Sequence, residues 1–185
     1  DAAQLQGSSL DRAELQEASL NGAQLQGASL DAAQLQGASL DAAQLQGSSL
    51  DRAQLQRATL YAAQLQGARL DGAQLQGAKL GWAQMQGARF DGAQFDSETS
   101  LQSATLRGSG WREVDLTMLT VRSERLAQSY GDASVKLPEG IPYPAHWARN
   151  RETYEPVTLD WKEFERQWRA FQAKIGYEPP KEYQL

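Results

Sequence analysis

The first half of the chain repeats every five residues, a period that belongs to neither regular secondary structure. A large apolar residue recurs at every fifth position from Leu5 to Phe95, and Ala or Ser stands two positions before each of them. A five-residue step would rotate an α-helix by about 140° and spread these residues around its axis. In a strand, the odd step would send them to alternate faces. A chain that turns a corner every five residues brings them into one interior, so the period predicts a solenoid.

The repeat AQLQG, as in residues 23–27, resembles the A-(D/N)-L-x-x signature of the pentapeptide-repeat family. The Ala and Leu positions agree over residues 1–95. The resemblance implies a mainly β fold, a right-handed four-sided β-helix solenoid with four quintets in each coil. The position before Leu departs from the signature, because it holds Gln, Ser, Thr, Arg, Lys or Glu and never Asp. If short Asp or Asn side chains cap the corners in the family, then in this chain another position must supply that cap, or the cap is absent.

The five-residue register slips once and then recovers. Phe95 is followed six residues later by Leu101, and steps of five resume through Leu106, Trp111 and Leu116. We therefore expect the β-helix over residues 1–116, with a one-residue bulge within 96–100. All six prolines and 11 of the 15 aromatic residues lie after residue 110, which predicts a different kind of structure in the C-terminal part.

Residues 117–185 are expected to form a Pro- and aromatic-rich appendage with one amphipathic α-helix at about 160–175. Trp161, Phe164 and Trp168 follow the 3–4 spacing of a single apolar stripe, which Phe171 and Ile175 continue. Such a short helix is not stable alone in water. We expect it to cap the β-helix by covering its open end or a flank, which protects the core and the unpaired strand edges. Recruitment of another protein by the same stripe is the alternative.

Residues twenty apart should stack in consecutive coils, so the sequence defines columns on the surface. The Gln columns before and after Leu are expected to form amide ladders along the axis. The most distinctive column is acidic: Asp11, Asp31, Asp51, Asp71 and Asp91. Carboxylates about 5 Å apart repel by only about 1 kcal/mol per pair in water. One interpretation is a solvated face whose side chains point into solvent, and the other is a stripe that binds a partner protein.

Composition excludes several kinds of chemistry. The chain has no cysteine, which excludes disulfides, thiolate metal sites and a cysteine nucleophile. No apolar run approaches the roughly 18 residues of a membrane span, and no phosphate-binding loop, metal-ligand spacing or nucleophile elbow is present. The single histidine, His146, has no catalytic neighbour at a telling spacing. We therefore expect neither an enzyme nor a cofactor, and no membrane contact from this sequence.

The net charge of −5 lies in the repeat region, which disfavours nucleic-acid binding. The leading hypothesis is a non-catalytic structural scaffold or protein-interaction module of bacterial origin. The resemblance implies an alternative, because some family members mimic duplex DNA as acidic rods and bind DNA gyrase. Only the acidic column supports that alternative here.

The sequence opens in mid-repeat, without an initiator Met or a signal peptide. We expect a fragment of a longer, cytoplasmic protein, although an upstream targeting segment would change that location. An uncovered first coil exposes backbone groups and the edges of its leucines. We therefore expect end-to-end self-association through the N-terminal coil, or further repeats or a cap upstream.

Overall fold

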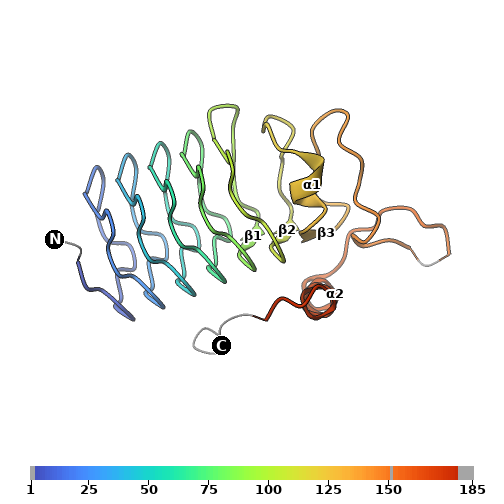
Figure 1. The fold of residues 1–185 in the computed structure, drawn as a ribbon, viewed down its shortest axis with the longest axis horizontal. Coiled ribbons are helices and arrows are strands. Elements are labelled where there is room, and N and C mark those ends of the chain that lie inside the picture. The colour runs from blue at the N-terminus through green and yellow to red at the C-terminus, as the bar shows by residue number, and fades with distance from the viewer. Residues whose placement is uncertain (1–2, 151, 179–185) are drawn as a thin grey trace.

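The computed structural model describes residues 3–150 and 152–178, and the chain winds into a stack of similar coils (Figure 1). Parallel bridges join residues twenty apart, four for each coil. Those of the first coil are Gln4 with Gln24, Ser9 with Ser29, Glu14 with Gln34, and Ser19 with Ser39. Each side of a coil is too short for a regular strand, so the sheets consist of single-residue bridges along the axis. This architecture is a β-helix.

The leucines and alanines of the repeat fill the interior. Leu25, Leu30, Leu35 and Leu40, one from each side of a coil, have no exposed surface. The alanines two positions before them are equally buried, except that Ala28 is 1% exposed. The prediction that Leu and Ala face inward is therefore confirmed. Leu5, Leu10 and Leu15 in the first coil are only partly buried, because no earlier coil covers them in the described structure.

Every corner of the repeat requires a left-handed backbone at the second residue after Leu. Glycine occupies most of these positions, for example Gly27 with φ of 64°. Ala32 and Arg52 adopt φ of 55° and 58° at the same place. Left-handed geometry is unfavourable for residues with a side chain, so the stacked coils must impose it.

The stacking offset rises from twenty to twenty-one residues between the Gln74–Gln94 bridge and the Lys79–Ser100 bridge. The extra residue is accommodated in a tight turn around Asp96. Its Oδ1 atom accepts hydrogen bonds from the backbone of Glu98 and Thr99 (both 3.0 Å) and from Gly77 in the coil below (2.8 Å).

The β-helix does not end at residue 116, so the predicted boundary is about one coil too early. Strand β1 (Arg89–Asp91) pairs in parallel with β2 (Gly110–Arg112), which pairs in parallel with β3 (Tyr130–Gly131). Beyond β2, Asp115 still bridges Lys136.

The sequence did not reveal this additional coil because only part of it matches the Ala and Leu positions of the repeat. Val121 and Leu126 continue the steps of five and are buried in the main core at 8% and 1% exposure. The short helix α1 (Ser123–Leu126) occupies the place of a standard corner. Glu124 stands two positions before Leu126, where the repeat would place Ala.

The segment after the last coil folds back over the core. Leu137, Ile141 and Tyr143 pack against the main apolar cluster, and Trp147 is buried within it. Trp147 donates its indole N–H to the Ser129 carbonyl (2.9 Å).

Helix α2 (Trp161–Lys174) lies along the flank of the final coils (Figure 1). The Asp160 side chain caps its first turn by accepting a hydrogen bond from the backbone of Glu163 (3.1 Å). Its Trp168 lies against Gly110, where a Cβ atom would come within 2.8 Å of the indole ring. Glycine at this position therefore opens the surface on which the helix docks. No helix in the described part of the chain is long and apolar enough to cross a membrane.

Candidate functional surface

The aspartate column, Asp11 to Asp91, lines an open groove of about 910 Å³ along one corner of the β-helix. Arg12, Arg52 and Arg69 line the same groove, so its walls carry both signs of charge. This groove contains all five candidate residues and extends over successive coils.

The first four aspartates of the column each cap the backbone of the next coil. The Oδ1 atom of Asp11 accepts from the Asp31 N–H (3.1 Å), and Asp31, Asp51 and Asp71 do the same for their successors at 3.1–3.2 Å. At the opposite corner, Asn21 accepts from the Asp41 N–H (2.9 Å). The corner cap that the sequence lacks before Leu is therefore supplied by the residue after Leu.

A second interaction reaches each of these carboxylates from the residue eighteen positions later. The hydroxyl groups of Ser29 and Ser49 donate to Asp11 and Asp31. In the next two coils arginine takes the place of serine, so Arg69 pairs with Asp51 and Arg89 pairs with Asp71.

The side chains of the column therefore do not all point into solvent, although Asp11 is exposed. The side chains of Asp51 and Asp71 are only 16% and 21% exposed. Backbone N–H groups and arginines draw these carboxylates against the coil surface. In sequence, Arg69 and Arg89 stand two residues before Asp71 and Asp91, but the stack pairs each of them with the aspartate of the preceding coil.

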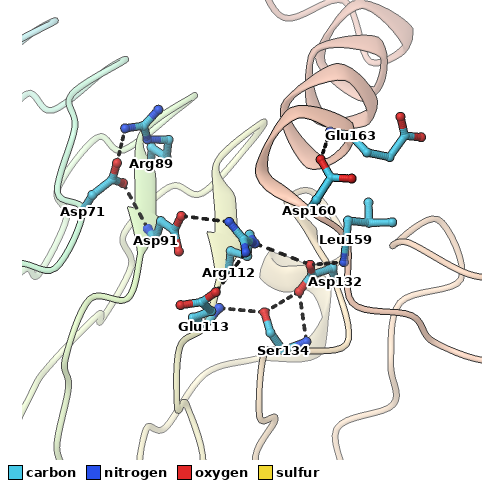
Figure 2. A network of polar contacts seen from close by, with 10 residues as sticks. All are labelled: Asp71, Arg89, Asp91, Arg112, Glu113, Asp132, Ser134, Leu159, Asp160 and Glu163. Atoms are coloured by element: carbon cyan, nitrogen blue, oxygen red, sulfur yellow. Dashed lines mark hydrogen bonds and ion pairs between the residues drawn. The ribbon is translucent and has the colours of Figure 1, made fainter.

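After Asp91, the next residue in the column is the positively charged Arg112, which connects the column to the C-terminal segment (Figure 2). Arg112 stacks on Asp91 in the same column and contacts its carboxylate at 3.3 Å. Arg112 also lies 3.8 Å from the fully buried carboxylate of Asp132. Asp132 in turn accepts from the Leu159 N–H (2.9 Å), just before α2. The network therefore ties the position of α2 to the aspartate column.

Burial and charge shift the pKa values along the column in different directions. Hydrogen bonds from the Ser29 hydroxyl and the Asp31 N–H lower the pKa of Asp11. Desolvation raises the pKa of Asp51, and the neighbouring Asp71 adds to this effect. Desolvation also raises the pKa of Asp91 to about 6, despite the opposing attraction of Arg112. The C-terminal end of the column is thus less completely charged at mildly acidic pH.

The Asp91→Asn variant should reveal this shift as a pH-dependent difference in stability. The folded-state pKa of about 6 exceeds the ordinary value of 3.8, so Asp91 contributes stability that is complete below about pH 4 and is lost as the pH rises through 6. Relative to the variant, the native protein should gain about 1 kcal/mol between pH 8 and pH 4.5, after allowance for solvent screening. Urea unfolding of both proteins across this range measures it, and a pH-independent difference would contradict the assignment.

Changing Asp31, Asp51 and Asp71 together to Asn should alter the free energy of unfolding by less than about 1 kcal/mol. Asparagine keeps the Oδ1 acceptor, as Asn21 already demonstrates, and the Arg69 side chain is 42% exposed, so solvent screens its pair with Asp51. The matched Ala triple variant should lose about 3 kcal/mol, because three backbone N–H groups lose their partners. Urea unfolding compares the two. Equal losses would show that the charge, and not the acceptor, stabilises the stack.

The glutamine ladders run diagonally between coils. The Nε2 group of Gln26 donates to Oε1 of Gln44 (2.6 Å), and Gln46 makes the same contact with Gln64. The amides therefore pair at an offset of eighteen residues, between the column after Leu and the column before it. The amide ladder is present, but it joins two columns that the sequence suggested were separate.

Two exposed aromatic residues lie half a coil away from the aspartates. Tyr61 is 53% and Trp82 57% exposed, at the corner that other coils build from Asn21, Asp41 and small residues. Neither residue was predicted from the sequence to have a functional role. The available signal was a tryptophan at a left-handed corner position, where the repeat otherwise places Gly, Ala or a charged residue.

Within residues 3–150 and 152–178, no group of three or more His, Asp or Glu side chains is placed to hold a metal ion. His146 uses its Nε2 atom to contact the Ser129 carbonyl (2.7 Å) and stacks on Phe171. The histidine is thus engaged in packing the appendage.

Comparison with known families agrees with the repeat and the coil geometry. The model of the pentapeptide repeats matches eight copies over residues 1–37, 38–77 and 73–109. This chain belongs to the pentapeptide-repeat family. No curated protein sequence matches this pentapeptide-repeat protein.

Solved structures of similar proteins include three of different origin. A pentapeptide repeat protein, Rfr23, from the cyanobacterium Cyanothece 51142 is 26% identical over 59% of this chain and 63% of its own length, with a TM-score of 0.29. This chain therefore spans less than two thirds of that structure. A pentapeptide repeat protein of the Arabidopsis thaliana thylakoid lumen is 18% identical over 90% of both chains (TM-score 0.33).

The third is full-length QnrB1, a plasmid-mediated fluoroquinolone resistance protein. It is 14% identical over 95% of this chain and 98% of its own length, with a TM-score of 0.48.

Proposed function

We propose that this protein is a non-catalytic scaffold that binds another protein. The observation that carries the proposal is the exposed pair Tyr61 and Trp82, which we call the aromatic corner, on the surface of the repeat region. Tryptophan and tyrosine are enriched at protein interfaces, where they supply much of the binding energy. The fully buried Leu and Ala core below makes a rigid platform, which limits the entropy lost on binding.

We also infer that the coils are right-handed and four-sided and that the C-terminal segment caps the stack. Four bridges for each twenty residues support the four sides, and the general right-handedness of connections between parallel strands supports the hand of the coils. The packing of Leu137, Ile141 and Tyr143 against the core, and of α2 along the flank, supports the second.

Capture of partners from the source cells tests the proposed function. Three forms of the tagged chain are compared: the native protein, the Tyr61→Ala/Trp82→Ala double variant, and the Asp31→Asn/Asp51→Asn/Asp71→Asn triple variant. A partner should be retained by the native and triple-variant proteins and lost by the double variant. Retention by the double variant with loss by the triple variant would move the binding surface to the aspartate column.

The DNA-mimic alternative is less well supported by the charges of the column. Arg69, Arg89 and Arg112 each pair with one of its carboxylates, so the stripe has much less negative charge than five free aspartates would give. We expect no effect on DNA supercoiling by gyrase. Protection or inhibition of gyrase in that assay would favour the alternative.

End-to-end association through the first coil stays a prediction. The partial burial of Leu5, Leu10 and Leu15 is consistent with an edge that a further coil would cover. Light scattering of this chain at increasing concentration tests it, and a monomer throughout would contradict it.

A further inference from the structure

The aromatic corner spans consecutive coils. The Tyr61 ring lies over the next coil, because a Cβ atom on Gly81 would come within 3.2 Å of its Cδ2 atom. Trp82 follows Gly81 directly, and its backbone N–H donates to the Gln102 carbonyl of the coil beyond (2.8 Å). The two aromatic side chains therefore sit on a rigid, hydrogen-bonded backbone, one coil apart.

The coil that follows Trp82 contributes to a polar hollow of about 460 Å³. Gln102 and Ser103 line it, together with Arg122 and Arg125 from the next coil. We call it the arginine hollow. Because Gln102 is hydrogen-bonded to Trp82, the hollow continues the surface of the aromatic corner along the axis.

The arginine hollow carries excess positive charge in a protein whose net charge is −5. Arg125 donates to the Leu101 carbonyl (2.7 Å), and Arg122 is exposed. Neither guanidinium forms an ion pair with any residue that the structure describes. Among the residues that the structure describes, Glu98 is the only acidic one that lines the hollow, and Lys79 donates to its backbone carbonyl at 2.8 Å.

We propose that the aromatic corner and the arginine hollow together bind an extended acidic segment of a partner protein. An apolar side chain of the segment packs on Tyr61 and Trp82, and a neighbouring carboxylate pairs with Arg122 and Arg125. Guanidinium groups bind carboxylates through paired, charge-assisted hydrogen bonds, and tryptophan, tyrosine and arginine are the residues most enriched in binding hot spots. This inference rests on the proposed function and specifies the chemistry of the partner.

A defined peptide tests the inference without knowledge of the natural partner. The probe is a blocked hexapeptide of alternating leucine and aspartate, and its control replaces aspartate by asparagine. In an NMR titration of the isotopically labelled chain, shifts should concentrate on the Trp82 indole N–H and the Arg122 and Arg125 guanidinium signals. The asparagine peptide should bind at least about tenfold more weakly, because it lacks the charge that the arginines recognise.

Variants separate the contribution of the aromatic corner to binding from that of the arginine hollow. Trp82→Ala and the Arg122→Gln/Arg125→Gln double variant should each weaken binding of the aspartate peptide by about tenfold or more. Trp82→Ala should fold, because Ala62 occupies the equivalent corner with φ of 55°. Tyr154→Ala is the matched control, since Tyr154 is a 73% exposed aromatic residue outside this surface, and it should leave binding unchanged.

Several results would overturn the inference. They are equal affinity for the two peptides, shifts centred on the aspartate column, or stronger binding of a neutral glucan oligosaccharide than of the aspartate peptide. If the double arginine variant still captures the natural partner while Tyr61→Ala/Trp82→Ala does not, the inference fails and the proposed function stands. If no protein is captured by the native chain, the proposed function itself fails.

Discussion

Replacing Leu55 by Ala is expected to lower the free energy of unfolding by about 2–5 kcal/mol. Leu55 is fully buried, and Leu35 and Leu75 occupy the same position in the coils on either side, also without exposure. Truncation therefore leaves a cavity inside a stack whose hydrogen bonds prevent it from collapsing. Urea unfolding followed by circular dichroism measures the loss.

Gln56→Ala is the matched control in the same coil and should lower stability by less than about 1 kcal/mol. Gln56 is partly exposed and loses one amide hydrogen bond to Gln74, while its own Oε1 atom has no partner among the described residues. Equal losses in the two variants would contradict the assignment of inward and outward positions.

Trp168→Ala should release α2 from the β-helix, with a loss of about 3–5 kcal/mol in the docking of the helix. Trp168 is 3% exposed, lies against Gly110, and donates its indole N–H to the Gly108 carbonyl (2.7 Å). Removal of the ring therefore leaves a cavity at the docking surface and reduces the hydrogen bonds of the Gly108 carbonyl to the one from Gln172 (2.9 Å).

Hydrogen exchange separates undocking of the helix from global unfolding. Amides of residues 161–174 should lose protection in the Trp168→Ala variant, while those of Leu25 to Met85 should keep it, because they belong to the separate core. The Lys162→Ala variant, at an exposed position of the same helix, should leave both regions protected. Loss of protection in the repeat region would show that α2 is required for the β-helix to fold.

The sequence was most informative where one interaction recurs in every coil. A strict five-residue period predicted which side chains face inward, because a single interior can be filled in only one way by such a repeat. It was less informative where fewer residues match the repeat. The coil containing Val121, Leu126 and β3 was for this reason predicted to belong to the appendage. A helical corner and a buried Gly131 in place of Leu interrupt the pattern there.

The candidate surface was only partly predictable for a related reason. The positions of the aspartates followed from the twenty-residue stacking, but their partners did not. A hydrogen bond from Ser29 to Asp11, or an ion pair from Arg69 to Asp51, depends on the diagonal offset between coils. The arginine hollow depends on the register shift near Asp96 and on α1, neither of which the period describes.

Site-specific photo-crosslinking tests most directly whether the aromatic corner binds the partner. A photoreactive phenylalanine analogue replaces Ala62, beside Tyr61, in one form of the chain and Ala32, beside Asp31, in another. Both positions have φ of 55°, so the two substitutions place equal strain on the backbone. In the source cells, the account predicts a partner crosslinked from position 62 and none from position 32. The same partner crosslinked from position 32 alone would contradict the account and return the function to the aspartate column.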